Sequence, residues 1–278
     1  MKSTQRMGRR SFLVGGLGLC GGLAIPVRSM ATPQRPQREA VTLRLPGLDP
    51  SHDGLRVAQL SDLHAGRQTP DELVRAAVAE ANALEPDLVV LTGDYVCHDR
   101  RDVGRARELL GGLSAPTYAV LGNHDVWTDL RGTAAALRSL GYEVLENGWT
   151  AVRLRGAPLS LVGVGDRVSG HEDVGRAFAG IPPHAAPLVL AHAPRTADRL
   201  RQLGRPLVCL SGHTHGGQIA VPLLTPLLLA GMAREPYLRG RYRLDGVQLY
   251  VNRGVGNSGV AVRVNSPPEV TLLTLRAA

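Results

Sequence analysis

The stretch LSGHTHGGQI, residues 210–219, decides how the rest of the chain is interpreted. It ends an apolar run with two histidines, His213 and His215, which are separated by one threonine and followed by two glycines. Two imidazoles buried side by side cost desolvation free energy unless a binding partner compensates them. The fold therefore has to bring other polar side chains to the same point.

Four further apolar runs end in a comparable polar loop. In layered α/β folds, ligands bind outside the carboxyl ends of the strands, so five such loops on one edge can share a single site. The five loops are SDLH (61–64), TGDY (92–95), LGNHD (121–125), LAHAP (190–194) and SGHTHGG (211–217), and they contain Asp62, His64, Asp94, Asn123, His124, Asp125, His192, His213 and His215.

This donor set predicts bound divalent metal ions. Imidazole nitrogens together with carboxylate and amide oxygens suit zinc, manganese or iron(II), whereas calcium takes oxygen ligands alone. The ligands suffice for two ions, and a carboxylate such as Asp94 can bridge ions that lie a few ångströms apart. An isolated Asp-x-His or Gly-Asp is usually only a surface turn, so the prediction depends on the whole ordered set. The alternative is an α/β protein whose polar loops merely contain histidines.

The ordered set Asp-x-His, Gly-Asp, Gly-Asn-His-Asp, His and Gly-His-x-His resembles the calcineurin-like metallophosphoesterase superfamily over roughly residues 40–278. The resemblance implies an α/β (α+β) fold, a four-layer αββα sandwich of two mixed β-sheets flanked by helices. GHTHGGQI and the tail NRGVGNSGVAVRVNSPPEVTLLTL resemble the exported or membrane-associated bacterial phosphodiesterase branch. Some relatives in that branch hydrolyse phosphodiester or pyrophosphate bonds in lipid-linked or nucleotide-sugar substrates.

The resemblance also implies a role for each ligand. Two divalent ions (manganese, zinc or iron) would lower the pKa of a bridging water, and the resulting hydroxide would attack phosphorus in line with the leaving oxygen. In this arrangement Asp62, His64 and His215 hold the first ion, Asn123, His192 and His213 hold the second, and Asp94 bridges the two.

Three more residues are candidates for catalysis or substrate binding. His124 follows a ligand, so we expect it to protonate the leaving group or to stabilise charge on the phosphoryl oxygens. We expect the carboxylate of Asp125 to orient His124, because carboxylates fix imidazole tautomers. Arg253 is a candidate phosphate contact, because a guanidinium offers phosphate a planar fork of donors. A structural hydrogen bond for His124 and a loop-anchoring role for Arg253 are the alternatives.

The expected enzyme is therefore a metal-dependent phosphoric ester hydrolase that acts on a phosphodiester or pyrophosphate bond. One alternative is a phosphomonoesterase or nucleotidase, because the same metal site serves both kinds of ester. The other is a non-catalytic scaffold that binds a partner through its metal. Nucleic acid is not an expected partner: without residues 1–31 the chain has 27 basic and 24 acidic residues, and only 4% of it is aromatic.

The N-terminus predicts export. Twin arginines, Arg9 and Arg10, precede an uncharged apolar run that ends near Pro26, and SMA follows at 29–31. This resembles a twin-arginine signal peptide, with a retained membrane anchor as the alternative. The predicted organisation is a signal over 1–31, a linker over 32–39 and a metallophosphoesterase domain over 40–278. We expect the protein in the periplasm or at the extracytoplasmic face, either free or in contact with the membrane or the wall.

Other features complete the predicted layout. The segment 219–233, IAVPLLTPLLLAGMA, is either a lip that accepts an acyl chain or a buried connection. We expect Cys97 and Cys209 to be free buried thiols, and histidines outside the motifs, such as His52, to be solvated. The pattern predicts strands over 41–45, 55–60, 87–94, 117–125, 187–194, 205–215 and 269–277, helices over 70–84, 103–113 and 129–141, and a hairpin around Asp245-Gly246.

Overall fold

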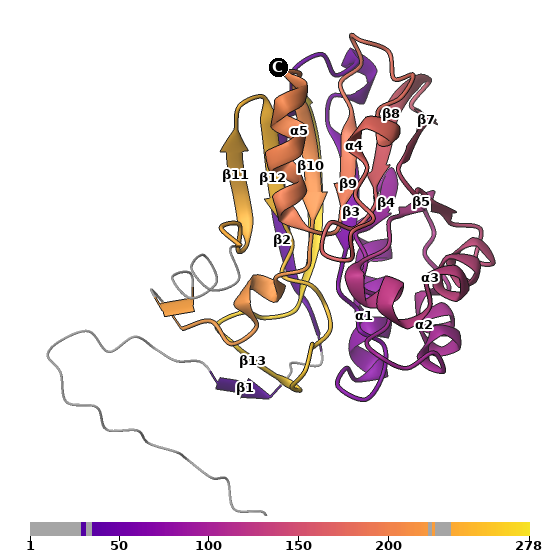
Figure 1. Ribbon diagram of the computed structural model, residues 1–278, viewed down its shortest axis with the longest axis vertical. Coiled ribbons are helices and arrows are strands. Elements are labelled where there is room, and N and C mark those ends of the chain that lie inside the picture. Colours follow the sequence, from indigo (N-terminus) through magenta and orange to yellow (C-terminus); the bar gives the residue numbers. More distant parts are fainter. Residues whose placement is uncertain (1–28, 32–34, 222–223, 226–234) are drawn as a thin grey trace, which may run out of the picture.

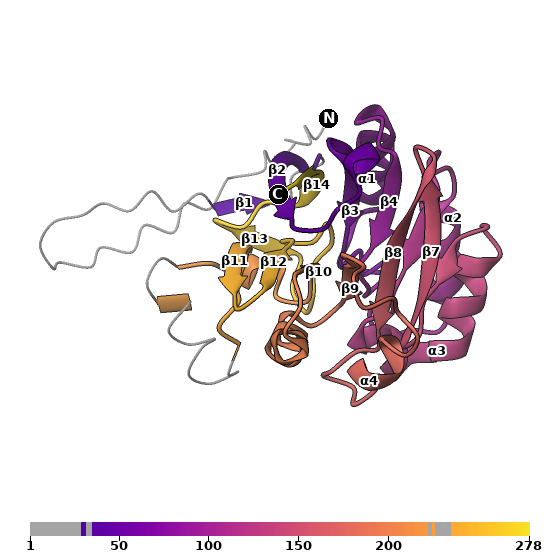
Figure 2. The ribbon, with the colours of Figure 1, turned by 90° about the horizontal axis from the view of Figure 1, so that it is seen from above.

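Two six-stranded mixed β-sheets lie face to face, and helices cover their outer surfaces (Figure 1, Figure 2). The computed structural model describes residues 29–31, 35–221, 224–225 and 235–278. The layers follow the order helix, sheet, sheet, helix, which confirms the predicted αββα sandwich.

The first sheet has the strand order β2-β14-β3-β4-β5-β6. β14 runs parallel to β2 and antiparallel to β3, while β3, β4, β5 and β6 are parallel to one another. Its strands are β2 (Gln37–Leu45), β3 (Leu55–Leu60), β4 (Leu88–Leu91), β5 (Thr117–Ala119), β6 (Glu143–Val144) and β14 (Glu269–Ala277).

The second sheet has the strand order β11-β12-β10-β9-β8-β7. Its four central strands are parallel, and both edge strands are antiparallel to their neighbours. The strands are β7 (Gly148–Leu154), β8 (Ala157–Val164), β9 (Leu188–Ala191), β10 (Leu207–Ser211), β11 (Gly240–Leu244) and β12 (Val247–Val251). β11 and β12 form the predicted hairpin around Asp245-Gly246.

Side chains alternate along the central strands because successive residues of a strand point to opposite faces. On β4, Leu88 and Val90 pack in the layer between the sheets, whereas Val89 and Leu91 pack against helices. The strands are therefore apolar on both faces, as expected for parallel strands covered on both sides. This explains why they read as continuous apolar runs in the sequence.

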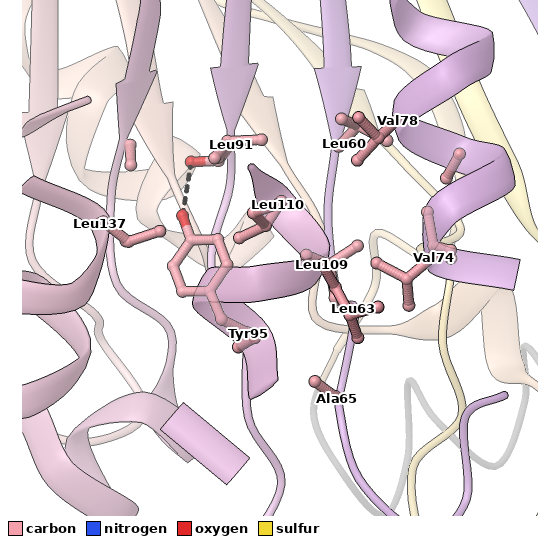
Figure 3. Packing of buried hydrophobic residues seen from close by; sticks show 14 of the residues in the cluster. Leu60, Leu63, Ala65, Val74, Val78, Leu91, Tyr95, Leu109, Leu110 and Leu137 are labelled. Carbon is pink, nitrogen blue, oxygen red and sulfur yellow. Dashed lines mark hydrogen bonds between the residues drawn. The ribbon is translucent and has the colours of Figure 1, made fainter. Parts of the chain in front are cut away.

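The outer helices each contribute an apolar face to these layers. The first sheet is covered by α1 (Asp71–Ala83), α2 (Asp102–Leu110) and α3 (Asn123–Arg138). The second is covered by the short helices α4 (Val174–Ala177) and α5 (Ala197–Leu200), and Cys209 of β10 lies in the apolar layer beneath them. Figure 3 shows the packing under the first three helices, with labelled residues Leu60, Leu63, Ala65, Val74, Val78, Leu91, Tyr95, Leu109, Leu110 and Leu137.

Several elements differ from the prediction. α3 begins at Asn123 and not near residue 129, so the Gly-Asn-His-Asp loop is the start of a helix. β2 begins at Gln37, inside the predicted linker 32–39, because it pairs with β14 along its whole length. Two short strands were not expected: β1 (Ser29–Ala31) pairs antiparallel with β13 (Val262–Val264), away from both sheets (Figure 1).

Some sequence predictions fall outside the described residues. These are the twin-arginine and apolar parts of the export segment, at residues 1–28, and most of the apolar segment 219–233. In the part of the chain that the structure describes, no helix has the length and apolar character that crossing a membrane requires. Cys97 and Cys209 are both free and buried, which confirms that prediction.

Candidate metal centre

The predicted ligands of the first ion lie together in the loops that follow β3 and β10. Asp62, His64 and His215 place their ligand atoms within 4.8 Å of one another, and all three residues are buried. The two Nε2 atoms of His64 and His215 are 2.9 Å apart, and His215 Nε2 is 3.5 Å from Asp62 Oδ1. Residues 151 positions apart in the sequence thus form one group of donors.

The predicted ligands of the second ion form an adjacent group. His192 Nε2 lies 3.1 Å from Asn123 Oδ1 and 3.3 Å from His213 Nδ1. Its other ring nitrogen, Nδ1, lies 2.8 Å from the carbonyl oxygen of Thr92 and donates its proton to it. That hydrogen bond fixes the ring so that Nε2 faces the group, which is the usual arrangement for a histidine that binds a metal.

Asp94 lies between the two groups. Its Oδ2 atom is 3.6 Å from His64 Nε2 on one side and 3.2 Å from His192 Nε2 on the other. Its second oxygen, Oδ1, accepts the backbone N–H of His124 at 2.9 Å, which holds the carboxylate in this orientation. A single carboxylate oxygen is therefore shared by both sets of histidines.

The backbone of these loops is left-handed at most of the ligands. Positive φ angles are uncommon for residues other than glycine, and they cluster at functional sites, where the surrounding structure enforces them. Neighbouring glycines give the loops room: a Cβ on Gly93, whose φ is 97°, would lie 2.7 Å from His192 Nδ1. The positive φ values are 51° at Asp62, 44° at His64, 57° at Asp94, 72° at His213 and 52° at His215.

Burial sets the charge of the site. Burial lowers the pKa of His64 to about 3 and that of His213 to about 4, so these imidazoles are neutral at pH 7. Asp94 and His192 behave differently: although burial opposes both charges, each stabilises the other. The pKa of Asp94 is held below its usual range and that of His192 well above it. The site thus combines an ion pair with imidazoles whose lone pairs are available.

His124, the predicted proton donor, lies at the edge of the cluster and is half-buried. Its Nδ1 is 2.8 Å from the carbonyl oxygen of Cys97 and donates to it, so Nε2 is the ring nitrogen left for other partners. The ring of His98 lies 4.9 Å from it, and that of Trp127 5.3 Å. His124 is therefore oriented by a backbone carbonyl and flanked by two aromatic rings.

The predicted contact between Asp125 and His124 is wrong. The Asp125 carboxylate instead accepts the backbone N–H groups of Asp94, Tyr95, Val96 and Gly122 at 2.8–3.3 Å. Burial raises the pKa of Asp125 to about 7, while these amide donors favour its ionised form. Asp125 therefore joins the Gly-Asp loop to the start of α3, and it acts on the site by positioning Asp94.

Arg253, the predicted phosphate contact, is already paired. Its Nη2 lies 2.5 Å from Glu39 Oε1, and its Nε lies 2.5 Å from Glu269 Oε2. Glu269 is buried and also accepts from the hydroxyl of Tyr250 at 2.6 Å. The guanidinium thus ties the loop after β12 to β2 and β14, which accords with the alternative, loop-anchoring role of Arg253.

Arg263 is a residue that the sequence did not single out. Although only 1% exposed, its guanidinium has three carbonyl partners and one imidazole partner. Nη2 lies 3.2 Å from Nδ1 of His215, a member of the first donor group. One signal could have found it: Arg263 is the single charged residue of the stretch 254–268, which follows Arg253. His52 also departs from expectation, since it is buried and its Nε2 donates to Leu154 O at 2.9 Å.

Comparison with known proteins agrees with this geometry. The family model described as calcineurin-like phosphoesterase matches residues 55–217. The chain is 36% identical over 226 residues to phosphodiesterase YaeI of Escherichia coli, covering 79% of this chain and 82% of that protein. It is 29% identical over 275 residues to UDP-2,3-diacylglucosamine pyrophosphatase LpxG of Chlamydia trachomatis, covering 79% and 83%.

A vertebrate relative is longer. The chain is 32% identical over 260 residues to a transmembrane protein with metallophosphoesterase domain of Danio rerio, covering 88% of this chain. It spans 58% of the length of that protein. The matched region contains every donor of the two groups described above. The chain therefore belongs to the calcineurin-like phosphoesterase family, whose members are metal-dependent hydrolases of phosphoesters.

Proposed function

We propose that this chain hydrolyses a phosphodiester or pyrophosphate bond with the help of two divalent cations. The observation that carries the proposal is the position of Asp94, whose Oδ2 lies 3.6 Å from His64 Nε2 and 3.2 Å from His192 Nε2. The first cation would be held by Asp62, His64 and His215, the second by Asn123, His192 and His213, and Asp94 would bridge them.

The chemistry of the donors supports two cations. Each group combines imidazole nitrogens with at least one oxygen donor, a set suited to zinc, manganese or iron(II). The Nε2 atoms of His64 and His215 lie 2.9 Å apart and face the same point, where one cation could bind both. His192 presents Nε2 because its Nδ1 is occupied by a backbone carbonyl. These features favour a site built for metal.

Bound cations would supply an ionised water at neutral pH and would neutralise charge on the phosphoryl oxygens. The residues around the cations would position the ligands and supply a proton. Asp125 accepts four backbone amides, three of them in or directly after the Gly-Asp loop, and this fixes Asp94. His124, with Nδ1 bound to Cys97 O, presents Nε2 as the position from which a proton would reach the leaving oxygen. Its protonated form would also stabilise phosphoryl charge.

The surface beside the metal loop supports a substrate with an apolar part. Five exposed apolar side chains, here called the apolar rim, follow or adjoin that loop. Gln218 ties its two halves together by donating to the carbonyls of Ser258 and Val260 at 3.0 and 2.8 Å. The rim consists of Ile219, Val221, Leu224, Val260 and Val262. An acyl chain on a lipid-linked or nucleotide-sugar substrate would pack against it.

The decisive experiment pairs elemental analysis with hydrolysis assays. Purified protein, stripped and reloaded with manganese, zinc or iron(II), is incubated with an aryl phosphodiester, an aryl phosphomonoester and a nucleotide-sugar pyrophosphate. We expect about two cations per chain and faster hydrolysis of the diester or pyrophosphate. Preference for the monoester would establish the phosphatase alternative, and metal binding without hydrolysis of any substrate would establish the scaffold alternative.

The apolar rim has its own test. Replacing Ile219 and Val262 by serine is expected to raise KM for an acylated substrate, with little effect on its deacylated analogue. Val168→Ser, at an exposed apolar position outside the rim, is the matched control. Equal rates for acylated and deacylated substrates in the unmodified protein would contradict the acyl-binding role.

We also propose that the chain is exported through the twin-arginine pathway. The sequence of residues 9–31 supports this, as described above. Cleavage after Ala31 would remove β1 from its pairing with β13, so fractionation should be combined with N-terminal sequencing of the mature protein. Replacing Arg9 and Arg10 by lysine is expected to keep the protein in the cytoplasm, and unchanged export would exclude this route.

A further inference from the structure

A third group of side chains that could hold a metal ion shares His64 with the first group described above. His64, Cys97 and His124 place their ligand atoms within 4.8 Å of one another. The proposed function uses His64 and His124 but leaves the Cys97 thiol without a role. This thiol borders a cavity of about 400 Å³ that is also lined by Arg67 and His98.

The two cysteines of the described chain lie in different surroundings. Cys209 lies on β10 within the apolar layer under α4 and α5, where burial raises the pKa of its thiol to about 12. Cys97, although only 4% exposed, belongs to none of the three apolar layers of the described chain. Packing alone therefore explains Cys209 but not Cys97.

The backbone around Cys97 is held at several points, which limits where its thiol can lie. Asp125 accepts the amides of the preceding residues, and His64 N donates to Asp94 O at 3.0 Å. The bridge between Ala65 and Val96 joins the two loops directly before the cysteine. The carbonyl of Cys97 accepts His124 Nδ1 at 2.8 Å. One residue thus orients His124 through its carbonyl and faces His64 with its sulfur.

We propose that Cys97 supplies a thiolate ligand to the cation that His64 binds, an inference that rests on the proposed metal centre. Burial, together with the nearby Asp94 carboxylate, raises the pKa of the Cys97 thiol, so the metal-free protein keeps the S–H bond at neutral pH. A coordinating cation deprotonates a thiol outright. The proton leaves to solvent, and a sulfur lone pair forms the bond to the cation.

A sulfur ligand changes which metal the site selects. Thiolates favour zinc over manganese and magnesium, which prefer oxygen ligands. Cys97 would add a thiolate beside the imidazole of His64, the residue that its group shares with the group of Asp62 and His215. We therefore expect the His64 position to prefer zinc, while the His192 position accepts harder cations.

Cobalt(II) is the probe, because a cobalt–thiolate bond gives a near-ultraviolet charge-transfer band that nitrogen and oxygen ligands do not. Full-length protein freed of metal by a chelator is titrated with cobalt(II), and bound cobalt is measured by elemental analysis. We expect the band to develop in the unmodified protein and to be lost in Cys97→Ser. Cys209→Ala, which removes a sulfur from the apolar core, is the matched control and keeps the band.

A second variant guards against a folding defect in Cys97→Ser. Cys97→Asp restores an anionic ligand without sulfur, so it should bind cobalt without the band and shift the preference from zinc towards manganese by at least ~10-fold. Full cobalt binding without a band in the unmodified protein would overturn the thiolate ligand and leave the proposed function standing. Failure of the unmodified protein to bind cobalt, zinc or manganese would overturn the metal centre itself.

Discussion

Nη2 of Arg263 lies 3.2 Å from Nδ1 of His215, and no carboxylate shares this buried guanidinium within the described chain. A guanidinium can only donate hydrogen bonds, so Nδ1 accepts, and the ring proton of neutral His215 resides on Nε2. Nε2 is also the nitrogen that faces His64 and Asp62. Burial, His64 and the positive charge of Arg263 together lower the pKa of His215 well below its usual value, so the ring is neutral in the metal-free chain. A cation at Nε2 would require the tautomer with the proton on Nδ1, in which Nδ1 no longer accepts from Arg263.

The first prediction concerns Arg263→Met, which keeps much of the side-chain volume but removes every donor. The carbonyls of Gly256, Arg253 and Ser266 lose a buried partner, so we expect the free energy of unfolding to fall by about 3 kcal/mol or more. Urea denaturation of the metal-free protein measures this. Arg243→Met, at an exposed position of β11, should change stability by no more than about 0.5 kcal/mol. Equal stabilities of the two variants would contradict the prediction.

The second prediction concerns His124→Ala. Turnover should fall by about 10²–10⁴-fold, as is typical for loss of a general acid, while both cations stay bound. The measurements are kcat and metal content on the same preparation, with the exposed His171→Ala as control. Loss of a cation from His124→Ala would instead make His124 a ligand.

The third prediction concerns Asp94→Asn. Because one carboxylate oxygen adjoins both His64 and His192, the substitution should weaken binding at both positions by at least ~10-fold. Competition with a chromophoric chelator gives the two dissociation constants. Asp129→Asn, which alters a carboxylate paired with Arg100 on the surface, should leave both constants unchanged. Weakening of one position alone would remove the bridging role.

The fourth prediction concerns pH. In the metal-free protein the carboxylate of Asp94 outweighs burial and raises the pKa of His192 well above 6.5. The stability that this ion pair contributes is therefore fully present below about pH 6.5 and is lost as the pH rises through the raised value. The thermal midpoint of the metal-free protein should accordingly decrease on going from neutral to alkaline pH.

The affinity of the protein for metal should depend on pH in the opposite direction. A cation binds His192 only after the proton has left, and it needs Asp62 ionised, whose pKa burial raises to about 6. Apparent metal affinity should therefore increase with pH, and binding near pH 7 should release protons. Calorimetric titrations in buffers of different ionisation enthalpy measure that release. Binding without proton release would contradict the charged state assigned to His192.

Local pattern was enough to place most of the elements. The runs 55–60 and 269–277 are β3 and β14 within a residue, and the Asp245-Gly246 turn joins β11 to β12. Their periodicity and turn residues are properties of neighbouring positions, which a sequence displays directly. The start of α3 was missed because Asn123, His124 and Asp125 resemble a loop, although acidic and amide residues also begin helices.

The contacts of the side chains around the proposed ligands could not be derived in the same way. Asp125 was expected at His124, its neighbour in sequence, but it binds the amides of Tyr95 and Gly122. Arg253 looked available, yet Glu269 of β14 and Glu39 of β2, which is 214 positions away, neutralise it. Such pairings depend on how the sheets come together, which no single loop encodes.

The amino-acid sequence by itself determined the fold class and the set of donors, because continuously apolar strands must be covered on both faces and five of these runs end in a polar loop. Only the tertiary structure decided how the donors meet. It set Asp94 between His64 and His192, turned the ligand loops into left-handed backbone, and brought Arg263 and Cys97 to the imidazoles. The physical reason is that the packing of the two sheets against each other sets the distances between groups far apart in sequence. The same packing enforces the strained backbone angles of the loops.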